Sequence, residues 1–181
     1  MTAPSSQTTL AAQLAEGSLA GNWTLDPAQS TVALKSKSMW GLVPVKGTFT
    51  EVEGAGTVSP TGDVTGQITV AAASVDTKNA RRDKHLRSKD FFLAEEHPLI
   101  TFAVAKFTPA ADGVTVEGTL TVRGRTNPVT FTAAATQGTD GAVALDAEIE
   151  VDRSKYGLTW NQLGMSSMHN TITIHAVFTR S

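Results

Sequence analysis

The side chains best suited to chemistry gather in one stretch, residues 74–102. Within it, Asp83, His85 and Ser88 supply the carboxylate, imidazole and hydroxyl groups that a hydrolase triad uses. The three residues are too close along the chain to adopt the bridging geometry of a triad easily, and the sequence has no nucleophile-elbow motif. We therefore predict no catalytic residues, and interpret Asp83 as a structural brace that accepts hydrogen bonds.

Histidines in and beyond this stretch raise the question of a metal site. His85, His97 and His169, with Asp83, carry donor atoms that zinc accepts, but no pair of them has the spacing of a helical two-histidine motif. The chain has no cysteine, which excludes thiolate ligands, thiolate catalysis and disulfides. We predict no metal site and no other cofactor.

Basic side chains are the other unusual feature of the stretch: Lys78, Arg81, Arg82, Lys84, Arg87 and Lys89. On a helix, the first three would share one face, where they could hold a phosphate or carboxylate head group or touch an anionic membrane. A solvated charged face is the alternative for each residue. We predict that Arg82, beside Asp83, supports the fold or faces a head group, and that His85 lies at the surface or at the mouth of a cavity.

The rest of the chain consists of short segments with alternating apolar and polar residues. Residues 114–122 and 143–152 show this two-residue period clearly, and about eight such segments follow Trp23. One-faced antiparallel strands must bring their apolar faces together, as a closed barrel or as two packed sheets. We favour a closed barrel because closure also removes exposed strand edges.

Three further predictions concern element boundaries. We expect one or two helical turns before Gly17, with Thr8 or Thr9 as the N-cap. A short strand is expected around residues 57–58, and one long strand from Val64 to Val75.

Length and charge limit the class of protein. At 181 residues the chain suffices for one buried core but not for two ordinary domains. We predict an N-terminal tail or short helix over residues 1–20 and one barrel domain over residues 21–181. The formal net charge of −2 argues against a surface built for nucleic acid, so we predict no nucleic-acid partner.

The N-terminal residues also bear on location. Residues 1–21 contain no Lys or Arg and no apolar run of the length that a signal peptide needs. No later segment is apolar over the length of a membrane span. We therefore expect a cytoplasmic protein without a transmembrane segment.

Small residues occur at positions predicted to face the barrel interior: Ala72, Gly118, Ala133, Ala147 and Ala176. In a barrel of this size they could leave room for one ligand, or they could offset larger neighbours in a filled core. Loop residues Met39, Trp40, Trp160 and Met165 lie near glycines and would form adaptable apolar surface at a cavity mouth. We expect Phe91 and Phe92 to anchor the central stretch, with one ring in the core and the other at the cavity wall.

Several sequence strings together carry a family resemblance. They are GNWTLDPAQSTV (residues 21–32), GLVPVKGTF (41–49), SVDTKNARRDKHLRSKDFF (74–92), HPLITF (97–102), VEGTLTVRGRTNPVTF (116–131) and RSKYGL (153–158). Over residues 21–181 the chain resembles the YceI-like family of polyisoprenoid-binding, lipocalin-like proteins. The resemblance implies an antiparallel barrel with a helical insert and an elongated cavity for a polyisoprenoid or similar lipid. The chain departs from the family in having Gln29-Ser30, and Lys35 to Lys37, where members commonly have histidines.

The combined prediction is a mainly all-β protein: an antiparallel lipocalin-like barrel of about eight strands with a short helical insert and a short N-terminal helix. Its expected function is to bind, and to carry or sequester, an isoprenoid, quinone or other long-chain lipid. The alternative is an enzyme or stress-response protein that acts on a lipid-like substrate with the same scaffold. A homodimer and transient contact with a membrane surface are left open. The candidate cavity or mouth residues are Met39, Trp40, Ala72, Arg82, His85, Phe91, Phe92, Phe102, Leu120, Phe131, Trp160, Met165 and Ile174.

Overall fold

The fold comes from a computed structural model, which describes residues 6–38, 42–110, 113–138, 140–161 and 167–181. Its helices and strands follow one another as α1 (Ser6–Glu16), β1 (Gly21–Leu25), β2 (Thr31–Ser38), β3 (Val43–Phe49), β4 (Val52–Val58), β5 (Val64–Ala71), η1 (Ala72–Ser74), β6 (Val75–Asp76), α2 (Ala80–Arg87), β7 (Leu99–Ala110), β8 (Gly113–Val122), β9 (Arg125–Gln137), β10 (Val143–Asp152), η2 (Arg153–Tyr156) and β11 (His169–Arg180).

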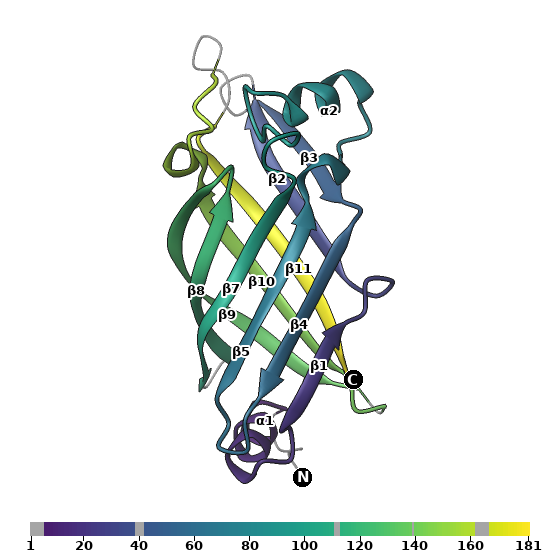
Figure 1. The fold of residues 1–181 in the computed structure, drawn as a ribbon, viewed down its shortest axis with the longest axis vertical. Helices are drawn as coiled ribbons and strands as arrows, with labels where there is room; N and C mark the ends of the chain where they lie inside the picture. The colour runs from purple at the N-terminus through teal and green to yellow at the C-terminus, as the bar shows by residue number, and fades with distance from the viewer. Residues whose placement is uncertain (1–5, 39–41, 111–112, 139, 162–166) are drawn as a thin grey trace.

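Eight of the strands close into an antiparallel barrel in the order β1-β4-β5-β7-β8-β9-β10-β11 (Figure 1). Pairing of β1 with both β4 and β11 completes the ring. The alternation that predicted the strands is visible in β10, where Ala147 and Ile149 are buried while Glu148 and Glu150 are exposed. The predicted lipocalin-like barrel with a helical insert and an N-terminal helix is confirmed.

The remaining strands extend one part of the wall. Strand β11 pairs with β1 along residues 178–180 and with β2 along residues 171–175, so β2 continues the line of β1 beside the same neighbour. Strands β3 and β6 then follow β2. Between β1 and β2, the buried hydroxyl of Ser30 accepts a hydrogen bond from Val177 N–H at 3.0 Å, which holds this break against the barrel.

Three predicted boundaries differ from the structure. Helix α1 has 11 residues, more than the predicted one or two turns, and begins before Thr8. Strand β4 is longer than the predicted strand around residues 57–58, because glycines 54 and 56 lie within it. The predicted strand from Val64 to Val75 ends at Ala71, where the Ser74 hydroxyl donates to the Ala71 carbonyl oxygen at 2.7 Å and turns the chain through η1.

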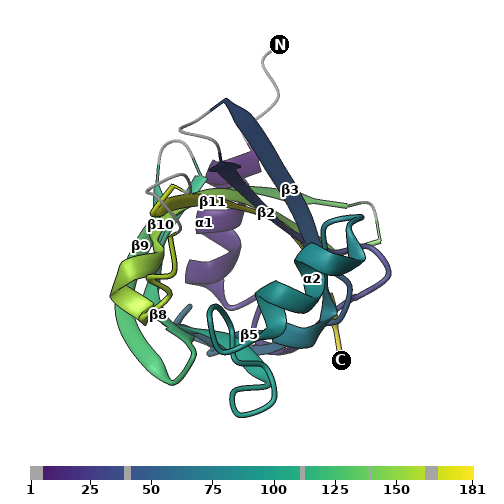
Figure 2. The same ribbon diagram turned by 90° about the horizontal axis from the view of Figure 1, so that it is seen from above.

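The two helices lie at opposite ends of the barrel, and we name the ends after them, the α1 end and the α2 end (Figure 1). Seen along the barrel, α1 crosses the far end of the ring of strands, and α2 lies over the rim beside β3 (Figure 2). The predicted helical insert is therefore placed where it can frame an entrance to the interior.

Candidate functional site

A cavity of about 450 Å³ extends through the barrel, with α1 and α2 both contributing to its wall. Side chains of every barrel strand line it, and most of them are apolar. The volume falls within the range of about 300–1,000 Å³ that is typical of ligand pockets. Polar lining side chains include Arg82, His85, Arg153 and Asn170.

Several apolar side chains that face the interior are only partly buried. Leu34, Ile68 and Ile174 line the cavity and pack against the core, yet each keeps intermediate exposure. In a filled core such side chains would be close to fully buried. The barrel interior is therefore hollow, which answers the question that the small inward residues left open.

The small inward residues do not all widen this cavity. Ala133, Ala147 and Ala176 line it. Gly118 instead lies against a phenyl ring, because a Cβ added there would be 2.7 Å from Phe102 Cζ. The absence of a side chain at Gly118 on β8 thus leaves space for the ring of Phe102, which lines the cavity from β7.

Apolar side chains close the α1 end. Leu10, Leu14 and Leu19 are buried in one cluster with residues of β8 and β9. The side-chain amides of Gln13 and Gln137 exchange hydrogen bonds of 3.0 and 2.6 Å, which join α1 to the end of β9. Since Leu10 and Leu14 also line the cavity, α1 forms its floor.

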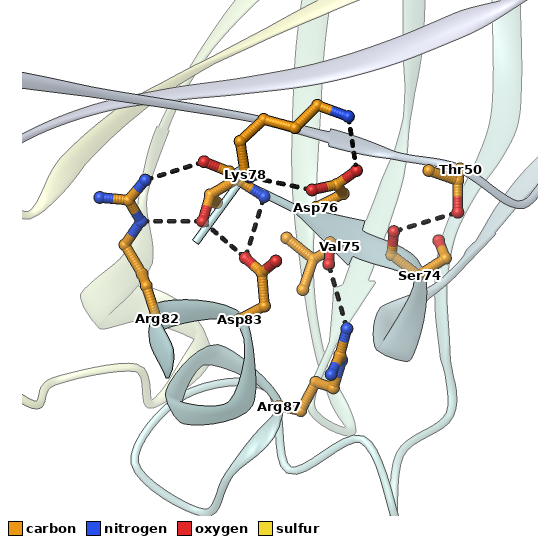
Figure 3. Close-up of polar contacts among 9 residues, drawn as sticks. Thr50, Ser74, Val75, Asp76, Lys78, Arg82, Asp83 and Arg87 are labelled. Carbon is orange, nitrogen blue, oxygen red and sulfur yellow. Dashed lines mark hydrogen bonds and ion pairs between the residues drawn. The ribbon is translucent and has the colours of Figure 1, made fainter. Parts of the chain in front are cut away.

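Hydrogen bonds that link Arg82 and Asp83, both labelled in Figure 3, to Thr77 hold α2 in place. Asp83 Oδ1 accepts from the Thr77 N–H at 2.9 Å and from the Thr77 hydroxyl at 2.6 Å. Arg82 Nε donates to the same hydroxyl at 2.8 Å, and Arg82 Nη2 donates to the Thr77 carbonyl oxygen at 2.9 Å. Asn79 caps the helix by accepting from Arg82 N–H at 3.0 Å. Asp83 thus accepts two hydrogen bonds from one residue outside the helix, and its role as a brace stays a prediction.

The six basic residues predicted in this stretch have different surroundings, and Arg82 is the one that lines the cavity. Lys78 forms an exposed ion pair with Asp76 at 2.9 Å. Arg87 donates to the Ala73 carbonyl oxygen at 2.9 Å and so ties α2 to η1. Two of the six, Arg82 and Arg87, thus tie α2 to the segment that precedes it.

Three rings cluster at the α2 end of the cavity. The centroid of the His85 ring lies 5.1 Å from the centroid of the Phe91 ring and 4.5 Å from that of the Trp160 ring. The centroids of the Phe91 and Trp160 rings are 5.5 Å apart. Phe92 is buried against Phe49, with ring centroids 5.9 Å apart, and it also lines the cavity. These contacts join α2 and the segment after it to the segment after η2.

The groups that resembled a triad have other partners. His85 Nε2 and Asp90 Oδ2 are 2.9 Å apart, and the Ser88 hydroxyl donates to the backbone carbonyl of His85 at 2.6 Å. Asp83 is occupied by Thr77. Among the described residues, no three His, Asp or Glu side chains come together as metal ligands.

Arg153 is a buried arginine in the wall of the cavity, only 6% exposed. Its Nε donates to the Ser167 carbonyl oxygen at 2.9 Å, and its Nη1 donates to the carbonyl oxygens of Leu158 and Trp160 at 2.7 and 2.8 Å. Its Cζ lies 5.6 Å from the centroid of the Phe91 ring. Burial lowers the pKa of the Arg153 guanidinium, and the charge of Asp152 opposes this shift.

Two buried polar atoms at this end have no hydrogen-bond partner within the described parts of the chain: Nη2 of Arg153 and Oδ1 of Asn170. Asn170 also lines the cavity, and it lies opposite Val151 in the pairing of β10 with β11. Neither residue was among the predicted cavity residues. The two-residue period of the strands could have identified them. The inward positions of β10, Ile149 and Val151, are followed two residues later by Arg153, and the inward positions of β11 begin with Asn170.

Most of the predicted cavity residues line the cavity: Arg82, His85, Phe91, Phe92, Phe102, Leu120, Phe131, Trp160 and Ile174. Ala72 is fully buried outside it, and its N–H donates to the Pro98 carbonyl oxygen at 2.9 Å. The predictions for Met39, Trp40 and Met165 lie outside the described residues.

No helix within the described ranges is long and apolar enough to span a membrane.

Comparison with solved structures places the barrel among known folds. BcnA of Burkholderia cenocepacia is 25% identical, with a TM-score of 0.77 over 84% of this chain and 98% of that chain. A polyisoprenoid binding domain from Saccharophagus degradans is 16% identical, with a TM-score of 0.70 over 88% of this chain and 98% of that chain. At that identity the second likeness shows a shared fold.

Sequence comparison shows the family. A UPF0312 protein of Staphylococcus aureus (strain MRSA252) is 32% identical over 149 residues, which cover 78% of this chain and 84% of that protein. The family model of the YceI-like domain matches residues 23–179, nearly the whole barrel. Except for residues 21 and 22, the strings that suggested the resemblance fall within one matched domain, and the chain belongs to the YceI-like family.

Proposed function

We propose that the protein binds a long-chain apolar lipid, such as a polyisoprenoid or a quinone, in the barrel cavity, and that it carries or sequesters this lipid. The observation on which the proposal rests is the mainly apolar cavity of about 450 Å³ inside a YceI-like barrel. The shared fold with a polyisoprenoid binding domain supports the class of ligand. Removal of an apolar chain from water would drive binding by about 25 cal/mol per Å² of buried area.

In this proposal the lipid enters at the α2 end, since leucines of α1 close the other end. The rings of His85, Phe91 and Trp160 would meet it first, and Asp83 would keep α2 in position by holding Thr77. Side chains deeper in the cavity would contact the chain of the lipid: Phe92, Phe102, Leu120, Phe131 and Ile174.

Native mass spectrometry of the purified protein, followed by extraction of bound lipid, tests the proposal directly. Carriage predicts one lipid per protein and no change in the lipid over time. The alternative, an enzyme acting on a lipid-like substrate, predicts turnover that falls in Asp83→Ala or His85→Ala. An empty protein with no affinity for geranylgeraniol or for fatty acids would contradict lipid binding altogether.

A matched pair of variants locates binding inside the barrel. Ile174 faces the cavity from β11, and its neighbour Thr173 is exposed on the outer face. Ile174→Trp should fill part of the cavity and so exclude part of the lipid chain. A loss of about 1.4 kcal/mol of binding free energy would weaken binding of geranylgeraniol about tenfold. Thr173→Trp adds the same group outside and should bind like the wild type. Equal binding by both variants would place the lipid elsewhere.

A cytoplasmic location, a homodimer and transient contact with a membrane surface stay predictions from the sequence. Cell fractionation and light scattering of the purified protein would test the first two.

A further inference from the structure

Arg153 is a buried cation that has no counterion within the described ranges of the chain. None of the ion pairs found there includes it, and its neighbour Asp152 is engaged by the N–H and hydroxyl of Ser154. Three carbonyl oxygens and the ring of Phe91 surround the guanidinium, and none of these groups carries a formal charge. Burial of a charge without an opposite charge is costly, so an anion that reached this position would be strongly favoured.

The unsatisfied atoms indicate where such an anion would bind. Buried polar groups in folded proteins nearly always have hydrogen-bond partners, so each exception needs an explanation. Here Arg153 Nη2 and Asn170 Oδ1 lack a protein partner among the described residues, and both residues line the cavity. Their strands are adjacent, with Asn170 paired to Val151, two residues before Arg153. The two exceptions therefore belong to one site.

The surroundings set the orientation of a ligand. Arg153 lies at the α2 end, near the rings of Phe91 and Trp160, and Asn170 lines the same cavity from the adjacent strand. From there to the leucines of α1 the cavity wall is mainly apolar. A ligand with one polar end would therefore place that end at Arg153 and its chain towards α1.

We propose that Arg153 and Asn170 form a buried head-group site for a long-chain ligand that ends in an acidic oxygen group, either a carboxylate or a phosphate monoester. The proposal rests on the proposed function, lipid binding in the cavity, and specifies the chemistry of the ligand.

The donor and acceptor sets of the two side chains fit such groups. Arg153 Nη2 donates to a charged oxygen, and a charge-assisted bond of this kind is about twice as strong as a neutral one. An amide has one acceptor oxygen and two N–H donors. Asn170 Oδ1 can therefore accept from a protonated phosphate oxygen, and with the amide turned over, its N–H group can donate to a carboxylate oxygen.

Two pairs of ligands test the head group while the chain stays the same: geranylgeranyl phosphate with geranylgeraniol, and palmitate with hexadecanol. Titrations followed by tryptophan fluorescence would give the four affinities. At least one acidic ligand should bind about 10- to 100-fold more tightly than its alcohol, the effect of one hydrogen bond to a charged group. Preference for the phosphate or for the carboxylate would identify the group that the site accepts.

Substitutions of Asn170 test the site without removing Arg153, whose bonds to three carbonyl oxygens support the fold. Asn170→Asp adds a negative charge at this end of the cavity, and the preference for the acidic ligand should fall to about the value for the alcohol, or below it. Asn170→Leu keeps a branched side chain and adds no charge, so the preference should fall less than in Asn170→Asp. Thermal melting of both variants would verify that they are folded.

The possible results separate the two proposals. Equal affinities for acids and alcohols, or an unchanged preference in Asn170→Asp, would overturn the head-group site but leave lipid binding intact. Failure of all four ligands to bind would overturn both proposals.

Discussion

The two ends of the cavity are built by different interactions. The α1 end is closed by Leu10, Leu14 and Leu19, whose packing is apolar and has no required direction. The α2 end is held by hydrogen bonds that converge on Thr77 and by a buried arginine that binds three carbonyl oxygens. An apolar seal tolerates any residues of the right volume, whereas a buried polar group tolerates only a suitable partner.

This difference suggests a division of labour. Non-directional packing suits a floor that only has to exclude water from the end of a lipid chain. Directional bonds suit an entrance, because they fix rings and charged groups in positions that a ligand must pass or contact. Substitutions at the two ends should therefore have different consequences, and three experiments test this.

The largest effect is expected at the α1 end. Leu10→Ala with Leu14→Ala should lower the free energy of unfolding by about 4 kcal/mol, because each truncation removes buried methyl groups and leaves a cavity. The matched control, Leu10→Met with Leu14→Met, preserves volume and should cost less than about 1.5 kcal/mol per site. Denaturant titration measures both. If the methionine variant lost as much free energy of unfolding as the alanine variant, the packing at the α1 end would depend on the specific shape of the leucines.

An intermediate effect is expected at the α2 end. Asp83→Leu keeps the branched shape of the side chain but leaves the N–H and hydroxyl of Thr77 without their acceptor, which should cost about 2 kcal/mol. Lys84→Ala, at an exposed position of α2, should stay within about 0.5 kcal/mol of the wild type. Thermal melting compares them. If Asp83→Leu melted like the wild type, the α2 end would be as tolerant as the α1 end.

The smallest effect concerns Asp152, at the start of η2. Hydrogen bonds from the hydroxyl and the N–H of Ser154 hold the pKa of Asp152 below its ordinary value. Because the folded pKa is lowered, the carboxylate stabilises the fold above its ordinary pKa, and this contribution is lost as the pH falls through the folded value. Asp152→Ala should therefore melt slightly below the wild type at neutral pH.

The melting difference of Asp152→Ala should shrink in acid, once the wild-type carboxylate is protonated. Melting curves recorded from neutral pH into acid would follow it. Glu150→Ala, on the exposed face of β10, serves as a control for loss of a carboxylate from the same strand. A difference that stayed constant over the whole pH range would assign the effect to helix geometry and not to charge.

Part of the site was predictable from the sequence, and part was not. Phe91 and Trp160 were predicted as cavity residues because they are aromatic. That Trp160 contacts both His85 and Phe91 could not be predicted, because it lies about 70 residues further along the chain, counted from the sequence numbers. Gly118 was predicted as a small inward residue that could widen the cavity, and it instead lies beside Phe102. Size at one position does not show which neighbour will use the space.

The sequence by itself determined the barrel, because the alternation of apolar and polar residues is a local property of each strand. It also determined the family, through strings of consecutive residues that can be read from the sequence without any tertiary contact. Only the tertiary structure decided that Arg153 and Asn170 both line one cavity, because the register of β10 on β11 sets Asn170 opposite Val151. Whether a buried charge has a counterion depends on every segment that packs around it, and no local pattern contains that information.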